Sequence, residues 1–214
     1  MKEEIILGAH DAFTYGKRVR VIDYLFRPFG RCQERTPLSL LLAGVRCFDI
    51  RVRFDETEKP YACHGLYRNE VNVEEEIENL YQVNTHITES DPNNSPLYFR
   101  LILEISKPDN KQEVLFQHWC EKLMNNYKEA KFIELRRKGD WKRLVMPNCT
   151  EPTIIQSVGS MAKDARWYEK ILPFTYARRT NKCRLRYNET PTNQSIEPTV
   201  SLTGQTYILL FDFL

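Results

Sequence analysis

The sequence lacks a dominant charge, a long apolar run and a signal peptide, and each absence narrows the classes of function. Its 31 basic and 29 acidic residues leave a net charge of only +2, so composition gives no argument for a nucleic-acid partner. No apolar run approaches the about 18 residues of a membrane-spanning helix. No signal peptide precedes the first predicted strand. We therefore expect a soluble protein without nucleic-acid binding, cytoplasmic as written or secreted if a leader has been removed.

The six cysteines are far apart and form neither a CxxC pair nor a Cys/His group with the spacing of a zinc site. We therefore expect no disulfide scaffold, although one or two isolated bridges stay open. Internal repeats and low-complexity segments are absent as well. A chain of 214 residues is long enough to bury a sizeable core, and we predict a single domain over residues 1–214.

Strand and helix signals alternate along the first 127 residues. Runs of β-branched, aromatic and aliphatic residues predict strands at 4–10, 46–54, 97–106 and 206–213. Apolar residues at helical spacing predict helices at 36–43, 71–83 and 111–127. This alternation is typical of a parallel α/β fold. Because the chain is short for eight full strand–helix units, we predict a distorted or incomplete (β/α)8 barrel.

Polar residues interrupt or follow the apolar strands in the first third of the chain. His10 and Asp11 end the first predicted strand, and Asp49 and Arg51 share one face of the second. His64 follows later in the chain, with Gly65 after it in a predicted loop. Catalytic residues of such barrels gather at the carboxyl ends of the strands. Two histidines, carboxylates and an arginine suit metal-free acid–base chemistry at a phosphate.

Three ordered segments resemble the X region of phosphatidylinositol-specific phospholipase C: residues 8–14 (GAHDAFT), 44–51 (GVRCFDIR) and 64–66 (HGL). The resemblance spans residues 4–67, with weaker likeness through residues 101–107. It implies a distorted (β/α) barrel that cleaves an inositol phospholipid in two steps, through a cyclic inositol phosphate. The implied partner is therefore a phospholipid or inositol-phosphate substrate.

The same resemblance implies roles for individual residues. His10 would be the general base and His64 the general acid, and imidazoles in general titrate near neutral pH, which suits both roles. Arg51 stands where the calcium-dependent eukaryotic members have an acidic residue, so the chain resembles the metal-independent bacterial type. No cofactor or metal is then expected, because the guanidinium would hold the phosphate oxygens. Asp11 and Asp49 would orient Arg51 and the attacking hydroxyl.

Three further candidates come from later strands. Asp212, in the last predicted strand, resembles the aspartate that holds the tautomer of the base histidine in the bacterial enzymes. The family also has a charged residue near the third strand, acidic in calcium enzymes and lysine in bacterial ones. Glu104 and Lys107 are both candidates for this position and for substrate binding.

Residues 17–31 follow the first predicted strand and mix basic with aromatic side chains. If they lie on the active face, they could contact a membrane surface transiently, with aromatic rings at the lipid interface and cations at anionic head groups. Alternatively, they could form a short helix that packs its apolar side on the barrel.

Two other functions stay open. A glycerophosphodiester phosphodiesterase is also a barrel with a histidine after its first strand, but that family typically has His-Arg-Gly there, whereas this chain has His10, Asp11 and Ala12. A catalytically silent module that binds inositol phosphate or lipid is the second alternative. Binding alone would need cations more than an acid–base pair, which argues against it.

Overall fold

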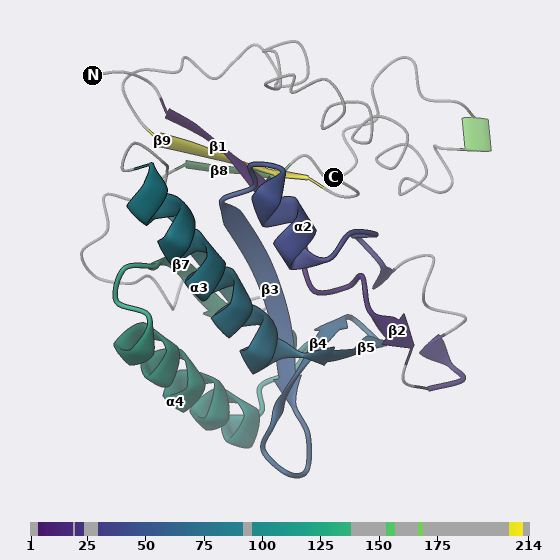
Figure 1. Ribbon diagram of the computed structural model, residues 1–214. Helices are drawn as coiled ribbons and strands as arrows, with labels where there is room; N and C mark the ends of the chain where they lie inside the picture. Colours follow the sequence, from purple (N-terminus) through teal and green to yellow (C-terminus); the bar gives the residue numbers. More distant parts are fainter. Residues whose placement is uncertain are drawn as a thin grey trace.

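The computed structural model describes residues 4–18, 20–23, 30–91, 96–137, 153–156, 167–168 and 206–211. These residues form a mixed α/β structure in which helices pack on a sheet (Figure 1). The elements in chain order are β1 (Glu4–Ala9), β2 (Lys17–Arg18), α2 (Pro37–Leu42), β3 (Cys47–Phe54), β4 (Pro60–His64), β5 (Tyr67–Asn72), α3 (Val73–Ser90), β6 (Tyr98–Leu103), α4 (Asn110–Asn126), β7 (Lys131–Arg137), β8 (Thr153–Gln156) and β9 (Thr206–Phe211).

Strand β3 lies at the centre of the sheet. It pairs in parallel with β1 and with β6, and the parallel series continues through β9 and β8 beyond β1 and through β7 beyond β6. The antiparallel strands β4, β5 and β2 extend the sheet from the carboxyl end of β3. Along the described part of the chain, β7 and β8 do not pair with each other, so closure of the sheet into the predicted distorted or incomplete barrel stays a prediction.

The alternation of side chains gives β3 two different faces. Phe48, Ile50 and Val52 belong to the large apolar core beneath the helices. Asp49 and Arg51 lie on the opposite, inner face and are buried there. A smaller apolar cluster precedes them on that face: Ile6, Cys47, Tyr98, Ile133, Ile208 and Leu210. The charged side chains therefore collect toward the carboxyl ends of the parallel strands.

The predicted strands and helices of the first 127 residues are confirmed, with shifted ends. The clearest shift is in α3, which begins at Val73 because the side chain of Asn72 accepts a hydrogen bond from the backbone N–H of Glu75. The same helix continues to Ser90, well past the predicted end. None of the helices in the described ranges combines the length and the hydropathy that crossing a membrane requires.

The antiparallel strands are the part of the fold that the sequence did not predict. Residues 17–18 form β2, which pairs with β5, and residues 24–29 of the same segment lie outside the described residues. His64 is the last residue of β4, so a β-hairpin that the sequence did not predict carries it, and the predicted loop at Gly65 is the turn of this hairpin. Gly65 makes the turn of that hairpin with a φ of +60°, a left-handed conformation that suits glycine.

Candidate active site

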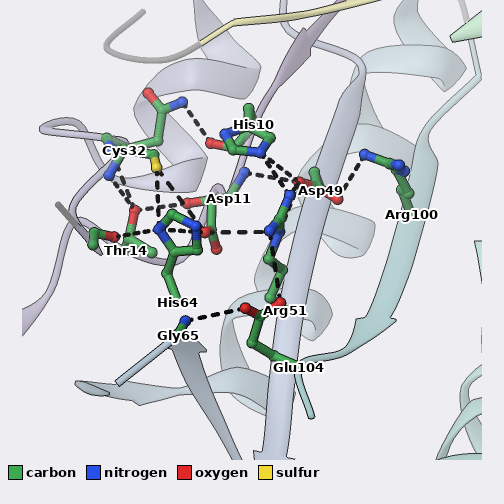
Figure 2. Close-up of polar contacts among 12 residues, drawn as sticks. His10, Asp11, Thr14, Cys32, Asp49, Arg51, His64, Gly65, Arg100 and Glu104 are labelled. Atoms are coloured by element: carbon green, nitrogen blue, oxygen red, sulfur yellow. Dashed lines mark hydrogen bonds and ion pairs between the residues drawn. The ribbon is translucent and has the colours of Figure 1, made fainter. Parts of the chain in front are cut away.

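The structure brings His10, Asp11, Asp49, Arg51 and His64 into one cluster on the inner face of the sheet (Figure 2). The first two follow β1, the next two lie on β3, and the last ends β4. All are buried except His64, whose side chain is 24% exposed. The two imidazole rings are nearly perpendicular, with centroids 6.2 Å apart. Five of the predicted site residues are thus neighbours.

Asp49 is the fully buried centre of this cluster. Its Oδ2 lies 3.3 Å from Nε of Arg51 and accepts the backbone N–H of Asp11 at 3.1 Å, and its Oδ1 lies 3.3 Å from Nη1 of Arg100. Burial alone would raise the pKa of Asp49, but the charges of Arg51 and Arg100 outweigh it and lower the pKa to about 2. Asp49 is therefore ionised and holds Arg51 in place.

Arg51 connects Asp49 with the first histidine. Its Nη2 lies 2.6 Å from Nε2 of His10. A guanidinium has only donors, so Nε2 presents its lone pair to Arg51, and the proton of the neutral ring is on Nδ1. Arg51 also lies 3.7 Å from Oδ2 of Asp11 and 3.6 Å from Oε2 of Glu104. Burial would lower the pKa of Arg51, but these carboxylates raise it, so the group stays charged.

The chain turns sharply after β1 at Asp11, whose φ is +48°. Aspartate tolerates this left-handed conformation better than most residues do. The turn is held by the backbone N–H groups of Asp11 and Ala12, which donate to the side chain and the carbonyl oxygen of Asp49 at 3.1 and 2.7 Å. It brings Oδ2 of Asp11 within 3.4 Å of Nδ1 of His64. Asp11 thus links the strand-borne charges to the hairpin.

Cys32 completes the surroundings of His64. Its Sγ lies 3.7 Å from Nδ1 of His64 and 4.0 Å from Oδ2 of Asp11, and the carbonyl oxygen of Gly30 lies 3.3 Å from the same Nδ1. The ligand atoms of Asp11, Cys32 and His64 are all within 4.8 Å of one another, so these residues could hold a metal ion. Sequence reasoning missed Cys32, because 21 and 32 residues separate it from its two neighbours.

Gly30 lies against the hairpin that carries His64. A Cβ at Gly30 would be 2.3 Å from Cβ of Tyr67, so only glycine fits there. Tyr67 is the partner of His64 across the β4–β5 hairpin. The loop with Cys32 is therefore in direct contact with this hairpin.

Glu104 and Lys107, the two candidates from the third strand, have different surroundings. Both follow the end of β6. Glu104 is fully buried, and its Oε1 accepts the backbone N–H of Gly65 at 3.1 Å, so it joins the turn after His64 to the cluster. Lys107 is exposed, and its role in substrate binding stays a prediction.

Arg100 is a buried member of the cluster that sequence reasoning did not single out. It lies directly opposite Asp49 in the pairing of β6 with β3. The available signal was a lone charge within an otherwise apolar strand (YFRLIL).

Asp212 lies outside the described residues. Strand β9 pairs with β1 up to Phe211, opposite Ala9, the residue before His10. The proposed contact between Asp212 and the base histidine therefore stays a prediction.

Comparisons with known proteins place the fold. No family model matches the chain, and no curated protein matches it. Among solved structures, phosphatidylinositol-specific phospholipase C from Listeria monocytogenes superimposes with a TM-score of 0.51 at 16% identity, over 97% of this chain and 87% of that one. A structure of the S. aureus enzyme, from work on its membrane binding, gives 0.54 at 14% identity, over 97% and 85%. The chain is therefore similar in fold to bacterial phosphatidylinositol-specific phospholipase C.

Proposed function

We propose that the protein is a phosphodiesterase of the phospholipase C type that cleaves an inositol phospholipid. The observation that carries the proposal is the pair of histidines, His10 and His64, which lie beside the fixed guanidinium of Arg51. An acid–base pair next to a permanent cation suits displacement at a phosphate, where charge develops on the non-bridging oxygens. The similarity in fold to bacterial phospholipases C supports the choice of substrate class.

The proposed reaction has two steps. First, Nε2 of His10 takes the proton of the inositol hydroxyl next to the phosphate. The oxygen then attacks phosphorus, the bond from phosphorus to the diacylglycerol oxygen breaks, and His64 protonates the leaving oxygen. The products are diacylglycerol and a cyclic inositol phosphate. In the second step water opens the cyclic phosphate, and the two histidines exchange roles.

Arg51 would bind the non-bridging oxygens of the phosphate. Its present contact with Nε2 of His10 occupies the lone pair that the base needs, so the substrate must draw the guanidinium toward phosphate. Asp49 and Glu104 hold Arg51 from two other directions. Because a guanidinium keeps its charge at every relevant pH, we infer that turnover needs no calcium.

Two carboxylates would position the two imidazoles. Asp11 lies beside Nδ1 of His64, which leaves Nε2 of that ring to protonate the leaving oxygen. For His10, we propose that Asp212 accepts the hydrogen bond of the Nδ1 proton. The pairing of β9 with β1 up to the preceding residues supports this assignment.

An apolar rim patch, formed by Val21, Ile22 and Leu66, supports transient contact with a lipid surface. These side chains are 87%, 48% and 60% exposed. The turn that carries the first two is held by the ion pair of Arg20 with Asp23 at 2.7 Å, and Arg20 also donates to the carbonyl oxygen of Leu66 at 2.6 Å. The patch therefore lies next to the turn of the β4–β5 hairpin. Exposed aliphatic side chains beside a phosphodiester site suit insertion among lipid head groups.

The decisive test is turnover of phosphatidylinositol vesicles in the presence of chelator, with the cyclic inositol phosphate detected by phosphorus NMR. We expect activity in the wild-type protein and a loss of at least about 100-fold in His10→Asn and in His64→Asn. His86→Asn is the matched control, because His86 is exposed on α3 and pairs with Glu89. This control should keep full turnover.

Other outcomes would contradict the proposal. Turnover that disappears with chelator would show that a metal ion, rather than Arg51, is the cation that the reaction needs. Turnover that survives His10→Asn would show that His10 is not the general base. Binding of inositol phosphate without turnover would indicate a silent binding module instead. Turnover of glycerophosphodiesters alone would indicate the other phosphodiesterase class.

Membrane contact is tested separately by sedimentation with vesicles that contain anionic lipid. Replacing the three residues of the apolar rim patch with serine should weaken binding by at least about tenfold, because their apolar area no longer leaves water. Leu42→Ser is the control, since Leu42 is 68% exposed at the other end of the sheet, before β3. Equal binding by both variants would place the contact elsewhere.

A further inference from the structure

Three side chains of different chemistry converge at the rim of the site. The edges of the triangle that they form are 3.4 Å from Oδ2 of Asp11 to Nδ1 of His64, 3.7 Å from that nitrogen to Sγ of Cys32, and 4.0 Å from Sγ to Oδ2. In a tetrahedral zinc site, with bonds of about 2.0 Å to oxygen and nitrogen and about 2.3 Å to sulfur, these edges measure about 3.3, 3.5 and 3.5 Å. A cation therefore fits after a small movement of the thiol.

The chemistry of the three ligands selects the kind of cation. A thiolate and an imidazole favour zinc and similar metals, whereas calcium and magnesium prefer oxygen ligands alone. Three protein ligands leave one position of a tetrahedron for water. The carbonyl oxygen of Gly30, 3.3 Å from Nδ1 of His64, adds a fourth electron-rich atom to the same place.

The net charge around the triangle also favours the binding of a cation. Asp11, Asp49 and Glu104 pair with the guanidinium groups of Arg51 and Arg100. When ionised, these three carboxylates exceed the two guanidinium groups by one negative charge. Loss of the thiol proton on metal binding adds a second, so a divalent ion is neutralised locally although Arg51 is near.

We propose that Asp11, Cys32 and His64 form a binding site for a zinc-like divalent cation, and that this cation inhibits the phosphodiesterase. The inhibitory role rests on the proposed function, in which His64 is the general acid. The cation takes the lone pair of Nδ1 in place of the proton that faces Asp11, and that proton and the thiol proton pass to solvent. The ring can then no longer become an imidazolium, and its remaining N–H is too weak an acid to protonate the leaving oxygen.

The site is tested directly with cobalt, a spectroscopic substitute for zinc. Chelator-treated full-length protein with added Co²⁺ should show the thiolate-to-cobalt charge-transfer band and the strong visible bands of a tetrahedral complex. Cys32→Ser should lose the charge-transfer band and bind zinc at least about tenfold more weakly in competition with cobalt. Cys63→Ala is the matched control and should keep the band, because Cys63 directly precedes His64 but is not among the ligands, and burial raises the pKa of its thiol.

The inhibitory role is tested by turnover of phosphatidylinositol vesicles, with each variant compared to its own activity in chelator. Zinc should inhibit the wild-type protein and Cys63→Ala, and Cys32→Ser should need at least about tenfold more zinc for the same inhibition. Calcium and magnesium should have no effect on any of them.

The metal site and its inhibitory role can be refuted separately. A wild-type spectrum without the thiolate band, or a band that survives Cys32→Ser, overturns the metal site. Zinc that binds but leaves turnover unchanged, or raises it, overturns the inhibitory role. A chain that shows no turnover in chelator contradicts the proposed function and the inhibition with it, whereas the cobalt spectrum still decides the site.

Discussion

The cluster on the inner face has a deep half and a rim half that are built differently. In the deep half, Asp49, Arg51 and Arg100 lie on the paired strands β3 and β6, and each oxygen of the carboxylate faces a guanidinium. In the rim half, Cys32 lies on a loop and His64 on a hairpin, and Sγ of Cys32 lies 3.7 Å from Nδ1 of His64. Opposite charges are matched in the first half, whereas in the second a thiol and an imidazole lie beside the carboxylate of Asp11.

This difference separates Asp49 and Arg100, which hold Arg51 in the deep half, from the rim groups, which can exchange a proton or bind a cation. Backbone pairing fixes the strand-borne charges relative to one another, and their burial makes any loss of a partner unfavourable. The rim groups gain from a proton or a cation placed among them, so they are suited to take part in chemistry. We therefore expect substitutions in the deep half to lower stability and substitutions in the rim half to lower turnover.

The largest effect on stability is expected for Asp49→Asn. This change keeps the shape of the side chain but leaves Arg51 and Arg100 without their shared counter-ion. The free energy of unfolding should fall by about 3 kcal/mol, as measured by urea denaturation. Glu89→Gln, an exposed change on α3, should alter it by less than about 0.5 kcal/mol. A loss below about 1 kcal/mol for Asp49→Asn would mean that the deep half does not stabilise the fold.

A smaller loss of stability is expected when the pH is lowered. The pKa of Asp49 is about 2 in the folded protein, below its ordinary value of 3.8. Its ionised form therefore stabilises the fold fully above about pH 4, and this contribution of about 2 kcal/mol is lost as the pH falls toward 2. Urea denaturation between pH 6 and pH 2.5 measures the decline. Asp49→Asn should show a shallower decline, and equal slopes in the two proteins would refute the assignment.

The smallest effect on stability, with a large effect on turnover, is expected for Asp11→Asn. Asparagine adopts the left-handed conformation at a φ of +48° readily, so the turn after β1 should persist. The free energy of unfolding should fall by less than in Asp49→Asn, because Arg51 keeps Asp49 and Glu104 as partners, whereas kcat should fall by about 100-fold because His64 loses its carboxylate. If stability instead falls as far as in Asp49→Asn, the two halves of the site are not distinct.

The sequence predicted the strand-borne part of the site better than the rim. Apolar runs that end in charged residues indicated both strands and placed Asp49 and Arg51 on one face, as the structure has them. The hairpin of His64 was missed because residues 60–72 show little apolar alternation, although their pairing partners in β3 and within the hairpin itself lie near in sequence. Cys32 was missed because only the fold brings it to Asp11 and His64, which are 21 and 32 residues away in the sequence.

The close approach of Gly30 to Tyr67 has a mechanical consequence. The loop backbone at Gly30 rests directly on the side chain of Tyr67, with no side chain of its own between them, so the two segments are in close contact. A hairpin that moves inward over a substrate pushes the loop ahead of it, and the thiol of Cys32 travels with the imidazole of His64. Because Asp11 lies on neither segment, such a motion alters the distances from His64 and Cys32 to Asp11 while it leaves the contact between the thiol and the imidazole unchanged.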